Sequence, residues 1–99
     1  MNDLIPSEFH LGQNYPNPFR EKTVIKYCVA YKTRVVLTVY NSEGEEIEKL
    51  VDEEKKPGTY EVEFSDVETG HALSLQSETY FYRLVAGDFT SEKKMVLEK

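Results

Sequence analysis

The chain has 99 residues, 39% of them hydrophobic and 30% charged, and this size and balance fit one small globular domain rather than two domains or a disordered segment. Eighteen acidic residues against twelve basic ones give a net charge of -6, which argues against a nucleic-acid backbone or an anionic membrane as the partner. The single cysteine, Cys28, excludes an internal disulfide and a thiolate zinc cluster. No apolar run approaches the roughly 18 residues of a membrane helix, so we expect no membrane insertion.

Alternation of apolar and polar residues predicts β-strands along most of the chain, and no window shows the 3.6-residue period of an amphipathic helix. Seven Tyr, five Phe and many Val and Thr suit a pleated, half-buried surface. We expect strands at residues 23–29, 35–40, 45–51, 60–64, 80–85 and 89–97. The alternating apolar residues of the clearest runs are Ile25, Tyr27, Val29, Val35, Leu37, Val39, Tyr60, Val62 and Phe64.

Turn-forming and charged residues separate these strands. The connections are expected at residues 41–44, 52–58, 66–79 and 86–88. In the strand at 45–51 the spacing is mixed, so Ile47 with either Leu50 or Val51 is expected to contact the core. In the last strand Met95 and Leu97 are expected to face the core, because the opposite face is bracketed by the charges of Lys94 and Glu98.

About seven short strands with turn signals every 8–12 residues favour an immunoglobulin-like antiparallel β-sandwich. The chain has no Trp and one Cys, so this would be a sandwich without the disulfide of antibody domains. A small antiparallel barrel is the alternative.

The residue types that carry catalysis are present but not in catalytic arrangements. His10 and His71 belong to no metal-ligand pattern, and each is expected to be an ordinary surface or loop histidine. Cys28 lies in a strand on the face opposite Ile25 and Tyr27, which predicts a small, partly buried filler rather than a nucleophile. The residue types of a hydrolase catalytic triad occur at Ser65, Asp66 and His71, but the sequence has no nucleophile-elbow motif to hold them in a catalytic arrangement. We therefore expect no enzyme and no cofactor.

Seven acidic residues between positions 43 and 54 form the densest charge cluster. They lack the alternate Asp/Asn positions, the Gly turn and the closing Glu of a calcium loop. We interpret them as the solvated surface of an edge hairpin, where charge discourages pairing with another chain.

The segment Gln13-Asn14-Tyr15-Pro16-Asn17-Pro18-Phe19 is unlike the rest of the chain, because its two prolines cannot join a central strand. Tyr15-Pro16 is a candidate cis bond, with trans as the default. A purely structural interpretation is an N-terminal strand that kinks between two sheets, with Tyr15 and Phe19 filling the interior.

Motifs at both ends of the chain, and positions between them, match one family pattern. They are Ile5 to Phe9 with Leu11, Gln13 to Phe19, Thr23, Ile25, Tyr27, Val35, Leu37, Val39 to Asn41, Gly44, Leu50-Val51, Gly58, Tyr60, Val62, Tyr80 to Leu84, Ala86-Gly87 and Lys93 to Lys99. In these residues the chain resembles the C-terminal sorting domain of type IX secretion cargo, the type A family of Bacteroidetes and related phyla. That family is similar to the Ig-like domain of the flagellar hook-capping protein.

The chain departs from the family pattern at three places. Arg20-Glu21 replaces the usual Asn-Pro, and Val29-Ala30 replaces a common Leu-Pro. Glu78 stands where the family usually has a Gly, whose positive φ a Glu tolerates poorly. The loop at residues 71–79 is therefore expected to follow a different path from the family's.

The resemblance implies that residues 1–99 are a single sorting domain, with 1–8 as the remnant of a linker from an upstream cargo domain. The outer-membrane translocon would recognise it, and a sortase-like signal peptidase would remove it, with the cargo released or attached to a surface glycolipid. The precursor would pass the periplasm and end at the cell surface or outside the cell. Met1-Asn2-Asp3 lacks the basic start of a signal peptide, so that peptide is expected upstream.

The residues implied in recognition lie in the two end motifs. They are Asn14, Tyr15, Pro16, Asn17, Pro18, Phe19, Tyr80, Tyr82, Arg83, Gly87, Lys93, Lys94, Met95, Val96 and Leu97. The alternative function is a non-catalytic structural or adhesive Ig-like module that contacts proteins or glycans through an exposed sheet face or edge.

Overall fold

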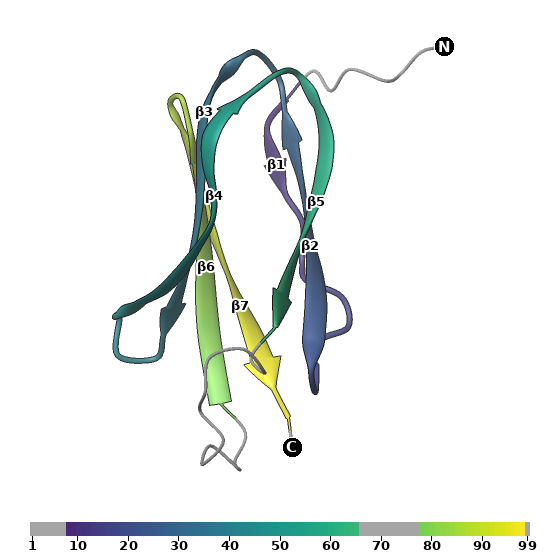
Figure 1. Cartoon of the computed structure of the whole chain (residues 1–99), viewed down its shortest axis with the longest axis vertical. Coiled ribbons are helices and arrows are strands. Elements are labelled where there is room, and N and C mark those ends of the chain that lie inside the picture. Colours follow the sequence, from purple (N-terminus) through teal and green to yellow (C-terminus); the bar gives the residue numbers. More distant parts are fainter. Residues whose placement is uncertain (1–7, 66–77, 99) are drawn as a thin grey trace.

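The computed structural model describes residues 8–65 and 78–98, and this part of the chain forms seven strands in two sheets packed face to face (Figure 1). The strands are β1 (His10–Leu11), β2 (Lys22–Val29), β3 (Thr33–Asn41), β4 (Glu46–Lys55), β5 (Gly58–Ser65), β6 (Glu78–Ala86) and β7 (Phe89–Leu97). One sheet has the order β1-β2-β5 and the other the order β4-β3-β6-β7, with antiparallel pairing throughout. The two sheets are separate, which confirms the sandwich and excludes the barrel.

The core lies between the sheets and follows the predicted alternation. Its buried apolar side chains are Leu11, Phe19, Ile25, Tyr27, Val29, Val35, Leu37, Val39, Val51, Phe64, Tyr80, Tyr82, Leu84, Ala86, Met95 and Leu97. The predicted inward faces of β2, β3 and β7 are therefore confirmed. Tyr60 and Val62 of β5 are half-buried and pack against this core. Cys28 is a free, half-buried thiol on the other face of β2, as predicted.

Strand β4 corrects one prediction. Residues 52–55 were expected in a charged loop, but they continue β4 and pair with β3, Asp52 with Val36 and Lys55 with Thr33. The pairing shifts register between Leu37 and Thr38, which accounts for the mixed apolar spacing of this strand. Val51 is buried as a result, while Ile47 and Leu50 only half-bury against the core.

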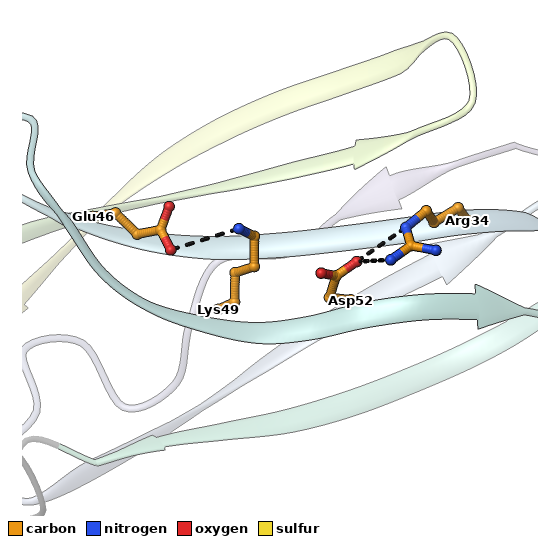
Figure 2. Close-up of polar contacts among 4 residues, drawn as sticks. All are labelled: Arg34, Glu46, Lys49 and Asp52. Carbon is orange, nitrogen blue, oxygen red and sulfur yellow. Dashed lines mark hydrogen bonds and ion pairs between the residues drawn. The ribbon is translucent and has the colours of Figure 1, made fainter.

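Edge position explains why a strand can carry so many charges. β4 is the outer strand of its sheet, so its acidic side chains stay in water, as the sequence predicted. Figure 2 shows the outward ion pairs, with Asp52 2.6 Å from Arg34 of β3 and Glu46 3.6 Å from Lys49. Each such exposed pair contributes about 0–1 kcal/mol, so the strand is held mainly by its backbone pairing.

Two of the predicted turns close as expected. After β3, the Asn41 side-chain oxygen accepts hydrogen bonds from the backbone N–H groups of Glu43 and Glu45, and Gly44 has a φ of 85°. Gly87, at the β6–β7 hairpin, has a φ of 60°.

The first residue of β6 is Glu78, which pairs with Leu97. The expectation of an altered loop at 71–79 lies for the most part outside the described residues, and so do Asp66 and His71. In residues 8–65 and 78–98 no helix exists that could span a membrane.

Candidate recognition site

The two end motifs, predicted separately, meet in the folded domain. After β1 the chain follows the edge of β2, where the backbone N–H and C=O of Tyr15 each make a 2.9 Å hydrogen bond with Val24. It then crosses to the other sheet. The N–H of Phe19 donates to the Val96 carbonyl at 2.9 Å, and the N–H of Glu98 donates to the Phe19 carbonyl at 2.7 Å. Residues 14–19, named the proline loop below, thus connect the two sheets.

The side chains of Gln13 and of the proline loop also cover the outer edge of β7. The amide of Gln13 donates to the Lys94 carbonyl at 2.8 Å, and the side-chain oxygen of Asn17 accepts from the Val96 N–H at 3.0 Å. Phe19 forms a parallel bridge with Leu97. The C-terminal half of β7 is therefore an edge strand whose backbone groups are already bonded to the N-terminal motif.

Tyr82 of β6 supports the start of the proline loop from within the core. Its hydroxyl accepts a hydrogen bond from the Asn14 N–H at 2.8 Å and donates one to the Gly12 carbonyl at 2.7 Å. The side chain is fully buried. This burial raises the pKa of Tyr82 to about 12, against the smaller opposing effect of the Asn14 N–H. The hydroxyl thus stays protonated and can fill both roles at neutral pH.

The buried Asn14 side chain fixes the conformation of the loop. Its amide donates to the Pro16 carbonyl at 3.1 Å and to the Thr23 hydroxyl at 3.0 Å, and the Thr23 hydroxyl donates to the same carbonyl at 2.9 Å. Its oxygen accepts from the Gln13 amide at 2.7 Å. Both proline bonds, Tyr15-Pro16 and Asn17-Pro18, are cis. The cis candidate at Tyr15-Pro16 is therefore confirmed over the trans default, and the cis bond at Asn17-Pro18 was not predicted.

One of the two aromatic residues of the loop fills the interior, and the other does not. Phe19 is buried and packs edge-on against Phe64, at 6.1 Å between ring centres. Tyr15 is 80% exposed, which corrects the expectation that it fills the core. The register explains the difference: Leu11 pairs with Tyr27 but Tyr15 with Val24, a slip of one residue that turns Tyr15 outward.

The predicted recognition residues divide by accessibility. The buried side chains are Asn14, Phe19, Tyr80, Tyr82, Met95 and Leu97. The exposed residues are Tyr15, Pro16, Asn17, Pro18, Arg83, Gly87 and Lys94, while Lys93 and Val96 are half-buried. In the folded domain a receptor can reach only the second group, and their role in recognition stays a prediction.

The contacts of residues 13–23 with Tyr82 and with residues 94–98 are named the joint between the motifs below, and not all of the predicted residues belong to it. Arg83 lies on the outer face of its sheet, 3.2 Å from Glu92 and with its guanidinium 5.2 Å from the ring centre of Tyr40. Gly87 lies in the hairpin at the start of β7, whereas the proline loop contacts the end of that strand. Lys93 and Lys94 point to opposite faces of β7, and Lys93 shares the face of Met95.

Two residues of the joint were not among those predicted. Gln13 belongs to the quoted motif, but nothing in the sequence indicates that its amide reaches β7. Thr23 could have been found, because a hydroxyl at an inward position of a strand needs a hydrogen-bond partner when it is buried. Within residues 8–65 and 78–98, no three His, Cys, Asp or Glu side chains lie close enough together to hold a metal ion.

Comparison with known proteins agrees with this geometry. A family model described as the secretion system C-terminal sorting domain matches residues 13–98, from the proline loop to the end of β7. The crystal structure of the periplasmic chaperone SfaE is similar, with a TM-score of 0.60 at 11% identity. The match covers 91% of this chain and 55% of that one, and at this identity it shows the fold alone, an Ig-like sandwich. No curated protein matches. Because the family model covers most of the chain, including both end motifs, this chain belongs to the family of type IX secretion C-terminal sorting domains.

Proposed function

We propose that this domain directs an upstream cargo through the outer-membrane translocon of the type IX secretion system. Membership of the family assigns it a sorting role in the export of a cargo precursor toward the cell surface or the extracellular space. The translocon recognises the folded domain, and a sortase-like peptidase then removes it or the cargo is anchored at the surface. A signal peptide upstream of this segment would bring the precursor into the periplasm.

The joint between the two end motifs lies at the end of the sandwich opposite to the point where the chain enters, and this position is the observation that best supports the proposal. The described chain enters at one end of the sandwich, where Phe9 stacks on Phe89 at the start of β7. It ends at the opposite end, where Phe19 and Glu98 share a backbone hydrogen bond (Figure 1). An upstream cargo would therefore join the end of the domain far from the proline loop. A receptor could contact the loop without steric conflict with the cargo.

We also propose that the domain carries no enzymatic activity. Among the described residues, His10 lies exposed in β1 and Cys28 has the Thr59 hydroxyl at 3.7 Å as its hydrogen-bond neighbour. Neither arrangement supplies a nucleophile with an adjacent base.

A fusion experiment tests the sorting function. Residues 1–99 are joined to the C-terminus of a periplasmic reporter in a bacterium with a type IX system, and the reporter is measured in the medium and at the cell surface. The reporter without the domain is the control, and we expect export only with the domain. Retention of the fusion in the periplasm would refute the sorting function. Binding to glycans or a partner protein in the absence of export would favour the alternative, an adhesive module.

A further inference from the structure

Tyr15 is the large apolar side chain most exposed to water in the described part of the chain. It is 80% exposed, compared with 52% for Tyr31 and 37% for Val85. Within residues 8–65 and 78–98 its ring makes no stacking contact, and its hydroxyl makes no hydrogen bond. The ring therefore contributes little to the stability of the fold and is accessible to another molecule.

The backbone beneath this ring is held firmly. Both backbone groups of Tyr15 are bonded to Val24 at 2.9 Å. The preceding residue, Asn14, is buried, and the carbonyl of the following residue, Pro16, accepts two hydrogen bonds. A ring held out from a rigid backbone loses little conformational entropy when it is bound, which is the property of an interface anchor.

Two prolines that follow Tyr15 in the proline loop add further apolar surface, around a hollow that Tyr15 itself does not line. Pro16 and Pro18 are both exposed, and with Phe19 and Glu98 they line an open hollow of about 510 Å³ at the end of the domain. Arg20, Glu21 and Lys22 line the remainder of this hollow, so its charges are mixed rather than strongly basic. The whole chain carries a net charge of -6. An anionic membrane surface is therefore a poor match, whereas an apolar pocket on a protein is a good one.

We propose that Tyr15, together with the exposed Pro16 and Pro18 that follow it in the proline loop, is the anchor by which a protein receptor of the secretion system holds the folded domain. The receptor surface would carry an apolar pocket that encloses the tyrosine ring, and the two prolines would contact the rim of that pocket. This inference rests on the proposed sorting function and names the surface that performs it.

Substitutions at Tyr15 in the reporter fusion test this proposal. Tyr15→Ala removes the ring, and Tyr15→Phe keeps it without the hydroxyl. Tyr31→Ala is the matched control, because it removes another exposed tyrosine ring, one that contacts Phe9 at the opposite end of the domain. Export is measured for each fusion, and the thermal unfolding temperature of each purified domain is measured in parallel.

We expect Tyr15→Ala to reduce export about tenfold or more, while its unfolding temperature stays within about 3 °C of the unaltered domain. Tyr15→Phe and Tyr31→Ala should export at close to the unaltered level. A second assay uses competition. The unaltered domain, produced unfused in the periplasm, should inhibit export of the fusion, and the Tyr15→Ala domain should not.

The possible failures are distinguishable. Equal export of the Tyr15→Ala and unaltered fusions would overturn the anchor but leave the sorting function standing. Equal loss with Tyr15→Phe would overturn the apolar pocket, and a large drop in unfolding temperature with Tyr15→Ala would show that the ring is structural. Binding of the domain to phosphatidylglycerol vesicles that depends on Tyr15 would overturn the protein receptor in favour of a membrane. If the unaltered fusion is not exported, both the function and the anchor fail.

Discussion

Replacing Tyr82 by Phe tests whether one buried hydroxyl holds the proline loop onto the sandwich. The change removes a single oxygen from the core and leaves the ring in place. That oxygen accepts from the buried Asn14 N–H and donates to the Gly12 carbonyl, at 2.8 and 2.7 Å. The variant therefore breaks the link between β6 and the loop without creating a large cavity.

The expected cost follows from the groups left behind. A buried N–H that loses its acceptor costs about 1–3 kcal/mol, and we expect about 2 kcal/mol for Tyr82→Phe. A domain of this size has about 5–15 kcal/mol of total stability, and each kcal/mol shifts the unfolding temperature by about 4–8 °C. The variant should thus unfold about 8–16 °C lower than the unaltered domain, and still fold at room temperature.

Urea denaturation at pH 7 measures this cost. The midpoint should fall with an unchanged slope, because the surface exposed on unfolding stays the same. Tyr31→Phe is the control, since Tyr31 is 52% exposed and should change stability by less than about 0.5 kcal/mol. If Tyr82→Phe also stays within about 0.5 kcal/mol, the hydroxyl does not hold the loop and the reasoning above is wrong.

Three further predictions concern the last strand and the buried tyrosine. Leu97→Asp loses the free energy of about 1.5–3 kcal/mol that burial of the leucine side chain contributes to stability, and it adds an unpaired buried charge. Circular dichroism should therefore show a largely unfolded domain, and a cooperative unfolding transition near the original temperature would contradict this. Lys94→Ala should leave stability within about 0.5 kcal/mol but weaken export of the reporter, and export at the unaltered level would remove Lys94 from the recognition residues. Lys94 is the cleaner test than a double change with Lys93, whose half-buried side chain lies on the core-facing side. Because the pKa of Tyr82 is about 12 in the folded domain and about 10 in the unfolded chain, the contribution of Tyr82 to stability should be constant below about pH 10 and should be lost as the pH rises to 12. The fall in stability over this range should therefore be shallower for Tyr82→Phe, and equal slopes would refute the assignment.

Placing the recognition residues in the fold changes how their substitution must be interpreted. Loss of export after changing Met95 or Leu97 would report unfolding, because both side chains are in the core. Loss of export after changing Tyr15 or Lys94 would report recognition, because both are exposed. The two effects are separable only when stability is measured on the same variants.

The strands and the class of fold were determined by the sequence itself. Alternation with a period of two places Ile25, Leu37 and Met95 on inward faces, and this local pattern needs no knowledge of the partner strand. The turn at Asn41 is equally local, since the side chain bonds to the backbone two and four residues on. The motifs at the two ends were sufficient to identify the family.

The extent of β4 and the joint between the motifs were decided only by the tertiary structure. Residues 52–55 are too charged to suggest a strand, and they form one because β3 offers its edge while their side chains remain in water. Asn17 and Val96 are far apart in the sequence, and the packing of two sheets brings them within hydrogen-bond distance. Tyr15 and Phe19 are both aromatic residues of one loop. A one-residue slip of register at the bridge to Val24 turns Tyr15 outward. The bridge to Leu97 holds Phe19 at the edge of β7, with its ring in the core. Neither of these two pairings can be recognised from the local sequence.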